Sequence, residues 1–116
     1  MTAGTVRLSI EGPVATVLFD RPAARNAMTW DMYQQLAAVC ERLPKEPGVR
    51  VVCLRGAGGE AFVAGTDIEQ FKTFDAQRGV EYERTIDAGM GRLAALDIPT
   101  VAVIEGWCVG GGLAIA

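Results

Sequence analysis

Two short, almost entirely apolar runs constrain the fold of this chain more than any other feature. Residues 49–54 and 100–104 are rich in valine and isoleucine, without a regular alternation of apolar and polar residues. Such runs are typical of strands buried on both faces of a sheet. Between them, a helical pattern over residues 79–96 places one apolar face on Tyr82, Ile86, Met90 and Leu93. Strands that alternate with helices predict an α/β fold with at least some parallel pairing.

The beginning of the chain predicts a hairpin followed by a helix. Val6, Leu8 and Ile10 alternate with polar residues, and a Gly-Pro turn separates them from a second apolar run. This pattern is typical of an antiparallel hairpin. Thr29 is a suitable N-cap for a helix that should end before Pro44. A short helix is also expected over residues 68–74.

Composition narrows the classes of function. The net charge is −3, and the eleven lysines and arginines are scattered, without the basic stripe of nucleic-acid-binding proteins. The apolar runs are too short to span a bilayer and the N-terminus has no signal pattern, so we expect a cytoplasmic protein with neither a membrane nor a nucleic-acid partner. The absence of histidine argues against Ser-His and Cys-His nucleophiles and against most zinc sites, and no metal is expected. The three cysteines are interpreted as buried thiols.

Two glycine turns carry the strongest indication of chemistry. Gly65 lies in a Gly-Thr-Asp segment, and residues 110–112 are three successive glycines between an apolar strand and the start of a helix. Glycines let a backbone approach a ligand closely. Amides at the start of a helix lack intrahelical partners and suit an oxygen that gains negative charge in a reaction. Either turn alone would more simply be explained by tight packing.

The turns belong to a series of motifs. Arg-Pro occurs at 21–22, Asn-Ala-Met at 26–28, FVAGTDI at 62–68, and PTVAVIEG at 99–106 with VGGG at 109–112. In order and spacing these motifs resemble the crotonase superfamily (enoyl-CoA hydratases and isomerases) over essentially the whole chain. The resemblance implies a crotonase-like spiral of ββα units, truncated before its C-terminal helices, with residues 1–116 as the N-terminal portion of a single domain. It also implies an acyl-CoA thioester ligand, with coenzyme A as part of the substrate and no separate cofactor, and a homotrimer or dimer of trimers.

The resemblance also assigns residues. It implies an oxyanion hole made by the backbone N–H groups of Thr66 and Gly111. Arg25 is the only cation within residues 24–27. It is equally well explained as a phosphate contact or as a solvated surface residue. Asp67 is interpreted as a helix cap rather than as a catalytic acid. The substrate contacts implied by the resemblance are Ala24, Arg25, Ala27, Ala64, Thr66, Asp67, Ile68 and Gly111.

One departure from the family pattern limits the prediction of a reaction. The first of two glutamates that hydratases use falls on Ala114, which cannot transfer a proton, and the second would lie beyond Ala116. We therefore expect a fragment of an enoyl-CoA hydratase/isomerase-family protein that stabilises a thioester enolate, with isomerisation or another enolate-forming reaction favoured over hydration. The alternative is a non-catalytic acyl-CoA-binding or trimer-associating remnant without a general acid or base. For a chain of these 116 residues, we expect no hydration of crotonyl-CoA.

Overall fold

The computed structural model describes residues 4–67 and 73–116. Its main elements follow one another as three successive ββα units. The first unit consists of β1 (Thr5–Glu11), β2 (Val14–Asp20) and α1 (Trp30–Arg42). The second consists of β3 (Val51–Gly56), β4 (Ala61–Val63) and α2 (Ala76–Ala94). The third consists of β5 (Thr100–Val103), β6 (Trp107–Cys108) and α3 (Gly111–Ile115). Two short 3-10 helices, η1 (Pro22–Ala24) and η2 (Leu43–Lys45), follow β2 and α1.

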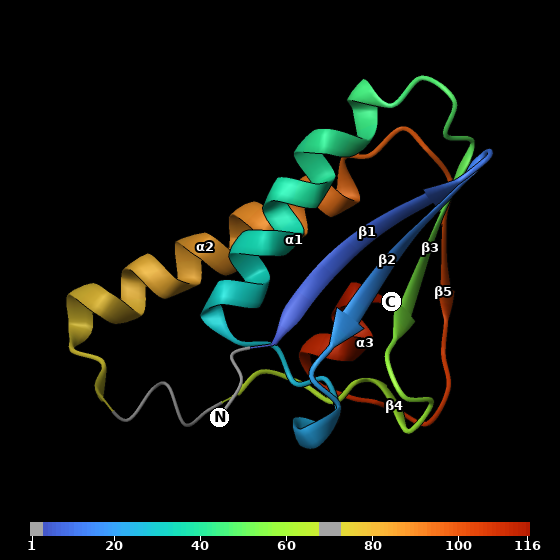
Figure 1. The fold of residues 1–116 in the computed structure, drawn as a ribbon. Coiled ribbons are helices and arrows are strands. Elements are labelled where there is room, and N and C mark those ends of the chain that lie inside the picture. Colours follow the sequence, from blue (N-terminus) through green and yellow to red (C-terminus); the bar gives the residue numbers. More distant parts are fainter. Residues whose placement is uncertain (1–3, 68–72) are drawn as a thin grey trace.

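The larger sheet has the strand order β1-β2-β3-β5. The hairpin of β1 and β2 is antiparallel, as predicted, whereas β3 pairs in parallel with both β2 and β5. This mixture confirms the α/β prediction with parallel pairing. Helices α1 and α2 lie side by side against the same face of this sheet (Figure 1).

A second, smaller sheet lies where the parallel strands of the larger sheet end. Strands β4 and β6 pair in parallel, and both follow closely after strands of the larger sheet, β3 and β5 (Figure 1). The 3-10 helix η1 likewise follows directly after β2. Because the carboxyl ends of parallel strands meet at one edge, three loops of distant sequence converge there, which is the usual place for ligands in α/β sheets.

The main core lies between the larger sheet and the helix pair. Phe19 of β2 and Val52 of β3 are fully buried against Met32 and Leu36 of α1 in one cluster. The two helices approach closely at Gly89 of α2, where an added Cβ would lie 3.1 Å from the carbonyl oxygen of Tyr33. A larger residue at that position would push the helices apart.

The expectation that both apolar runs form strands buried on both faces is wrong. In β3, Val52 and Leu54 are buried but Val51 and Cys53 are only half-buried, and the second run is more exposed still. Val101 and Ile104 are each 49% exposed. Strand β5 is an edge strand, and Val101 pairs with Cys53 of β3, which alternates with the buried residues Val52 and Leu54. Successive side chains point to opposite faces of a sheet, so Val101 points away from the helices. The first run also begins later than predicted, with β3 spanning Val51–Gly56.

Both long helices begin with a side-chain cap. The Thr29 side chain accepts a hydrogen bond from the Met32 amide (3.2 Å), which confirms the predicted start of α1. Asp75 caps α2 in the same way by accepting from the Arg78 amide (2.8 Å), so this helix begins three residues before the predicted position 79. The short helix expected over 68–74 falls largely outside the described residues.

The buried thiol of Cys40 should be unreactive. Burial raises the pKa of Cys40 to about 11, with a smaller opposing effect of Arg92. At pH 8 only about one thiol in a thousand would be ionised, and the thiolate is the reactive form. We expect iodoacetamide to label the half-buried Cys53 and Cys108 in the folded chain and to label Cys40 only after unfolding, as read by peptide mass spectrometry. Labelling of Cys40 at the rate of Cys53 would contradict this prediction.

The same thiol should make stability depend on alkaline pH. The pKa of a cysteine rises from 9.0 to about 11 at Cys40 on folding. The Cys40 thiol therefore ionises at a lower pH in the unfolded chain than in the folded one. The stability that the buried, neutral thiol contributes should be lost as the pH rises from about 9 towards 11.

Candidate functional site

The two glycine turns, far apart in the sequence, pack directly against each other. A Cβ added to Gly112 would lie 1.8 Å from the carbonyl oxygen of Val63, at the end of β4. The Val109 amide donates to the same carbonyl oxygen (3.4 Å). Gly110, which caps α3 with φ 55° and ψ −124°, would place a Cβ 3.6 Å from the Cα of Gly65. Only glycine allows this backbone conformation and this close approach.

The backbone around these turns leaves the amides of Thr66 and Gly111 unused. Thr66 forms a parallel bridge with Met28, in which Met28 donates to the Gly65 carbonyl (2.8 Å) and Asp67 donates to the Met28 carbonyl (2.8 Å). In such a bridge the N–H of the middle residue, here Thr66, points away from the partner segment. Gly111 is the first residue of α3, and a first-turn amide has no intrahelical acceptor. Within residues 4–67 and 73–116, neither amide has a backbone acceptor.

A tyrosine that sequence analysis missed lies at the same place. The Tyr33 hydroxyl is hydrogen-bonded to the Thr66 side-chain oxygen at 2.8 Å, and Tyr33 is only 2% exposed. Burial raises the pKa of Tyr33, partly offset by the hydrogen bond with Thr66, so the phenol is protonated at neutral pH. Tyr33 precedes Leu36 by three positions and Cys40 by seven, and this helical spacing could have placed it on the buried face.

Three of the residues expected to contact coenzyme A line one open pocket of about 390 Å³. Its walls are formed by η1 and the residues around β4: Pro22, Ala23, Ala24, Arg25, Glu60 and Ala64. A hydrogen bond from the Ala64 amide to the Arg25 carbonyl (3.1 Å) joins the two segments. Ala27, half-buried in the same loop, accepts a hydrogen bond through its carbonyl from the Arg21 guanidinium at 3.3 Å.

Arg25 is the cation of this pocket, and its side chain is 59% exposed. Its guanidinium lies 3.6 Å from a carboxylate oxygen of Glu60 and 5.9 Å from the ring centre of Trp107. Both neighbours are themselves more than half exposed. A pair so open to solvent holds the side chain weakly. Arg25 is therefore available to an anion in the pocket, and its role as a phosphate contact stays a prediction.

Asn26, which sequence analysis placed only in a motif, anchors the loop that carries Arg25. Its fully buried side chain accepts from the Arg21 amide (2.8 Å) and donates to the carbonyls of Ala57 (3.0 Å) and Ala61 (2.9 Å). Arg25 and Asn26 have left-handed backbones, with φ of 52° and 59°. Such conformations are unfavourable for residues other than glycine, although asparagine tolerates them best. The two hydrogen bonds to Ala57 and Ala61 hold this loop against the connection from β3 to β4 and against the start of β4, and the bond from Arg21 closes the loop on itself.

We expect Asn26→Ala to destabilise the protein by about 2 kcal/mol. The substitution leaves buried backbone groups without hydrogen-bond partners, and alanine adopts a left-handed backbone less readily than asparagine does. Urea denaturation followed by circular dichroism measures the change. Gln35→Ala is a suitable control, because Gln35 also accepts from a backbone amide, that of Val6, but at a more exposed position. An equal effect of the two substitutions would show that the Asn26 side chain does not anchor the loop.

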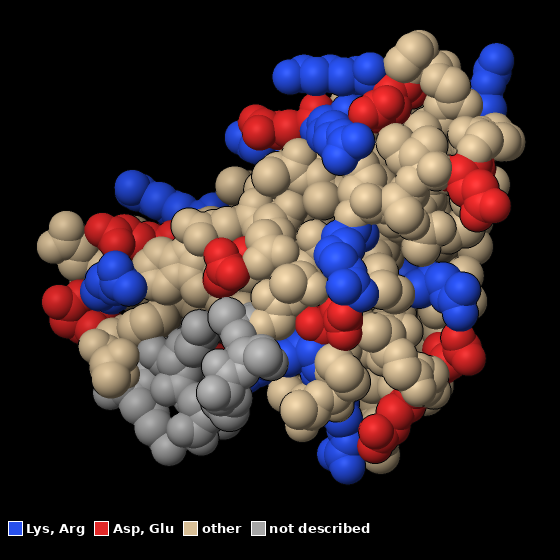
Figure 2. Space-filling model, viewed as in Figure 1, with Lys and Arg blue, Asp and Glu red and all other residues tan. Residues whose placement is uncertain are grey.

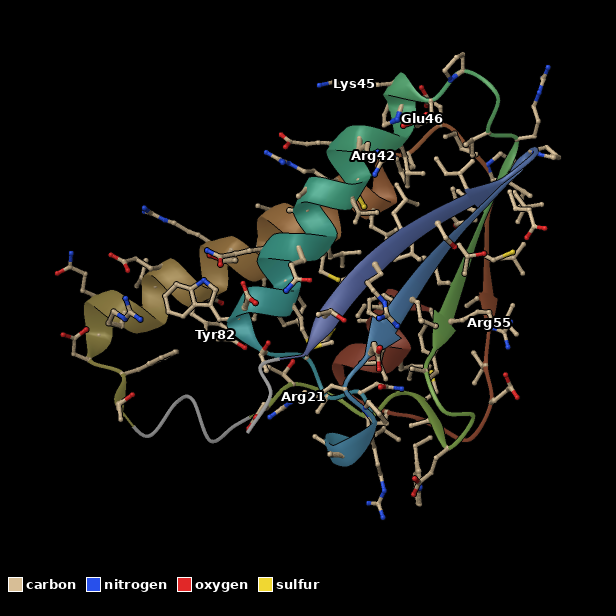
Figure 3. All side chains as sticks on the ribbon, in the orientation of Figure 1. Arg21, Arg42, Lys45, Glu46, Arg55 and Tyr82 are labelled. Atoms are coloured by element: carbon tan, nitrogen blue, oxygen red, sulfur yellow. The ribbon has the colours of Figure 1, made fainter. Side chains whose placement is uncertain are left out.

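Asp67 forms an ion pair. A carboxylate oxygen of Asp67 lies 2.8 Å from the Arg21 guanidinium, and the two side chains are only 13% and 4% exposed. Figure 3 shows Arg21 near the beginning of β1, close to the start of α1. The interpretation of Asp67 as a cap of the helix expected over residues 68–74 depends on residues outside the described part of the chain, and Ile68 also lies there. The observed pair links the Arg-Pro motif to the Gly-Thr-Asp turn.

The described residues offer few groups for proton transfer. Ala114 is exposed on α3 and lines a pocket of about 250 Å³ with Met90 and Leu93. Glu105 pairs with Arg55 at 3.2 Å on the surface, where Figure 3 shows Arg55 on the outer side of the sheet.

Acidic and basic residues are interspersed over the face shown in Figure 2. Among the described residues, no three His, Cys, Asp or Glu side chains are grouped as metal ligands, and no helix is long and apolar enough to cross a membrane.

Comparison with known proteins identifies the family. The model of the enoyl-CoA hydratase/isomerase family matches residues 9–116. The chain is 34% identical over its full length to a short-chain-enoyl-CoA hydratase of Clostridium acetobutylicum, of which it covers 44%. It is 37% identical to a hydroxycinnamoyl-CoA hydratase-lyase of Pseudomonas fluorescens, with 93% of the chain and 41% of the relative covered.

Solved structures agree with this result. An enoyl-CoA hydratase/carnithine racemase of Magnetospirillum magneticum superimposes with a TM-score of 0.92 at 37% identity, covering all of this chain and 43% of the other. An enoyl-CoA hydratase/isomerase family protein of Hyphomonas neptunium gives a TM-score of 0.90 at 30% identity, with 96% and 43% covered. The chain belongs to the enoyl-CoA hydratase/isomerase family and has the N-terminal part of the crotonase fold. It spans less than half the length of these relatives.

Proposed function

We propose that this protein binds an acyl-CoA thioester and holds its carbonyl oxygen between the backbone amides of Thr66 and Gly111. The observation that carries the proposal is the close packing of the two glycine turns, in which these amides have no backbone acceptor among the residues that the structure describes. When a proton leaves the carbon next to the carbonyl, negative charge develops on the oxygen. Two fixed amides stabilise that charge in the transition state more than in the ground state.

The coenzyme A part of the ligand would lie in the pocket beside Ala24, Arg25 and Ala64. The Ala64 segment leads directly from this pocket to Thr66, so one extended ligand can reach both places. Arg25 would pair with a phosphate and exchange its exposed contact with Glu60 for a stronger one with a more highly charged partner.

Proton transfer decides which reaction follows. Ala114 occupies the position at which the hydratases of this family have their first glutamate, and a methyl group cannot act as acid or base. This favours a reaction with one carboxylate, such as double-bond isomerisation or another enolate-forming step, over addition of water. It also favours the second candidate, an acyl-CoA-binding protein that is not a catalyst. Both candidates share the oxyanion hole. We expect no hydration of crotonyl-CoA by the 116-residue chain, as followed by the ultraviolet absorbance of the enoyl thioester.

Binding of the thioester can be tested with two substitutions at one residue. Gly111→Pro removes the N–H at the first position of α3, where proline fits a helix, and Gly111→Ala keeps it. Both variants add a Cβ at 3.0 Å from the hydroxyl oxygens of Tyr33 and Thr66, so the comparison between them isolates the N–H. We expect butyryl-CoA to bind roughly two- to tenfold more weakly to Gly111→Pro than to Gly111→Ala, because one hydrogen bond is lost. Free coenzyme A, which lacks the thioester carbonyl, should bind equally to both. The exposed Trp107 beside Arg25 provides a fluorescence signal for the titrations.

One outcome would show that the Gly111 amide is not a donor. In it, the unsubstituted chain binds butyryl-CoA more tightly than free coenzyme A, but the two Gly111 variants bind butyryl-CoA equally well.

The predicted homotrimer or dimer of trimers is a separate proposal that sedimentation velocity checks. The predicted cytoplasmic location is a further one, for which fractionation of cells is the measurement.

A further inference from the structure

Two hydroxyl groups lie beside the proposed oxyanion site, and the backbone mechanism makes no use of them. They are the Tyr33 phenol and the Thr66 side chain, joined by a hydrogen bond of 2.8 Å. A Cβ added to Gly111 would lie 3.0 Å from each of the two oxygens. Both hydroxyls therefore lie directly against the residue whose amide is one proposed donor, and Thr66 itself carries the other.

A count of protons shows that this pair has one donor to spare. Each hydroxyl carries one proton, and the hydrogen bond between them uses one of the two. Whichever oxygen donates, one O–H proton is left for a third acceptor. Within the part of the chain that the structure describes, neither side chain has another hydrogen-bond partner. The remaining proton is free for a ligand.

Burial determines which hydroxyl faces the ligand. Tyr33 is 2% exposed and belongs to the core cluster, whereas Thr66 is half-buried. The arrangement in which Tyr33 donates to the Thr66 oxygen leaves the Thr66 proton on the more accessible side. The same arrangement suits Tyr33, because a buried phenol keeps its proton and satisfies it within the protein.

We propose that the Thr66 hydroxyl, oriented by the Tyr33 phenol, donates a third hydrogen bond to the thioester carbonyl oxygen beside the amides of Thr66 and Gly111. This inference rests on the proposed function. Thr66 would touch the reacting oxygen through its side chain as well as its backbone, and Tyr33 would be a positioning residue. A third donor fixed before the reaction adds to oxyanion stabilisation without reorganisation, and a chain of two hydroxyls polarises the outer proton.

The test measures hydrogen bonding to the carbonyl itself. Butyryl-CoA labelled with ¹³C at the thioester carbonyl is bound to the protein, and its C=O stretch is read by isotope-edited infrared spectroscopy. A hydrogen bond lowers this frequency, and loss of a donor raises it. The variants are Tyr33→Phe and Thr66→Ala, with Thr66→Ser as the conservative substitution that keeps the hydroxyl. Tyr82→Phe is the matched control, since it removes the hydroxyl of another buried tyrosine, whose ring centroid lies 6.4 Å from that of Tyr33.

We expect Tyr33→Phe and Thr66→Ala each to raise the bound C=O frequency and to weaken butyryl-CoA binding roughly two- to tenfold. Binding of free coenzyme A should not change. Thr66→Ser and Tyr82→Phe should keep the frequency of the unsubstituted protein. The variant that combines Tyr33→Phe with Thr66→Ala should bind butyryl-CoA no more weakly than Thr66→Ala alone, because Tyr33 acts through Thr66.

The outcomes separate this inference from the proposed function. If the unsubstituted protein lowers the C=O frequency of the bound thioester and neither substitution changes it, the backbone site stands and the hydroxyl proposal is overturned. If the unsubstituted protein does not lower this frequency, or binds butyryl-CoA no more tightly than coenzyme A, both proposals are overturned. A raised frequency in Tyr33→Phe that also occurs in Tyr82→Phe would reduce the effect to general packing and overturn the hydroxyl proposal.

Discussion

Replacing Arg21 by methionine is expected to lower the free energy of unfolding by about 3–5 kcal/mol, among the largest effects of any single substitution in this chain. The Arg21 and Asp67 side chains are 4% and 13% exposed and lie 2.8 Å apart. Without the guanidinium, Asp67 would remain as a charge largely removed from water. The Ala27 carbonyl, which accepts from the same guanidinium, would lose that hydrogen bond.

A surface pair provides the matched control. Arg55 and Glu105 lie 3.2 Å apart, and both side chains are 51% exposed. Arg55→Met should therefore change the free energy of unfolding by less than about 1 kcal/mol. Urea denaturation of both variants measures the difference. Salt adds a second criterion, because 1 M sodium chloride screens exposed pairs much more than buried ones. Equal effects of the two substitutions would show that the Arg21–Asp67 pair is not a buried structural link.

A double substitution tests the reason for the effect. Replacing a buried ion pair by apolar residues of similar size is often close to neutral, because it removes the desolvation cost together with the attraction. Arg21→Met combined with Asp67→Leu should recover most of the stability lost in Arg21→Met alone. No recovery would indicate that the remaining hydrogen bonds of Arg21, and not the unpaired charge, account for the loss.

Features of the fold that depend on short-range sequence patterns were predicted well. The alternation of Val6, Leu8 and Ile10 predicted the hairpin, and Thr29 predicted the start of α1. Each follows from residues a few positions apart, for which strand and helix periodicity are reliable guides. Burial of Val101 was predicted less well, because it depends on whether a second layer covers that face of the sheet, which local sequence does not specify.

The contacts that hold the site together were not predicted. Tyr33 and Thr66 are separated by 33 positions, and Asn26 and Ala61 by 35. Such pairs meet only because β4 lies beside the loop after β2, a consequence of strand order in the complete fold. The crotonase resemblance itself is confirmed by the family comparison, whereas the backbone donors that it implies at Thr66 and Gly111 stay a prediction. The resemblance gave no partner for the Thr66 side chain, because Tyr33 belongs to α1, which lies outside the motifs that carry the resemblance.

Gly56 shows the same limit most clearly. In the sequence it is one of three glycines within residues 56–59, and its neighbours along the chain do not mark it as a closely packed position. In the structure an added Cβ would lie 2.1 Å and 2.4 Å from the carbonyl oxygens of Ala61 and Phe62, and 2.8 Å from the Asn26 amide nitrogen. Two of these three atoms belong to the backbone of β4 and cannot rotate away. Relief of the clash requires a shift of β4, which leads directly to the Gly-Thr-Asp turn.

Gly56→Ala is therefore expected to destabilise the protein by about 3 kcal/mol, at the upper end for overpacking, and to weaken butyryl-CoA binding by displacing Thr66 from Gly111. Gly91→Ala is the control. Gly91 lies inside α2, and an added Cβ there would meet no atom of the described residues within 4 Å, so alanine should stabilise by about 0.5–1 kcal/mol through its better helix propensity. Urea denaturation and the Trp107 fluorescence titration measure both effects. A stable Gly56→Ala variant with unchanged thioester binding would mean that β4 can move without disturbing the two turns, and that their close packing is not what brings the two amides together.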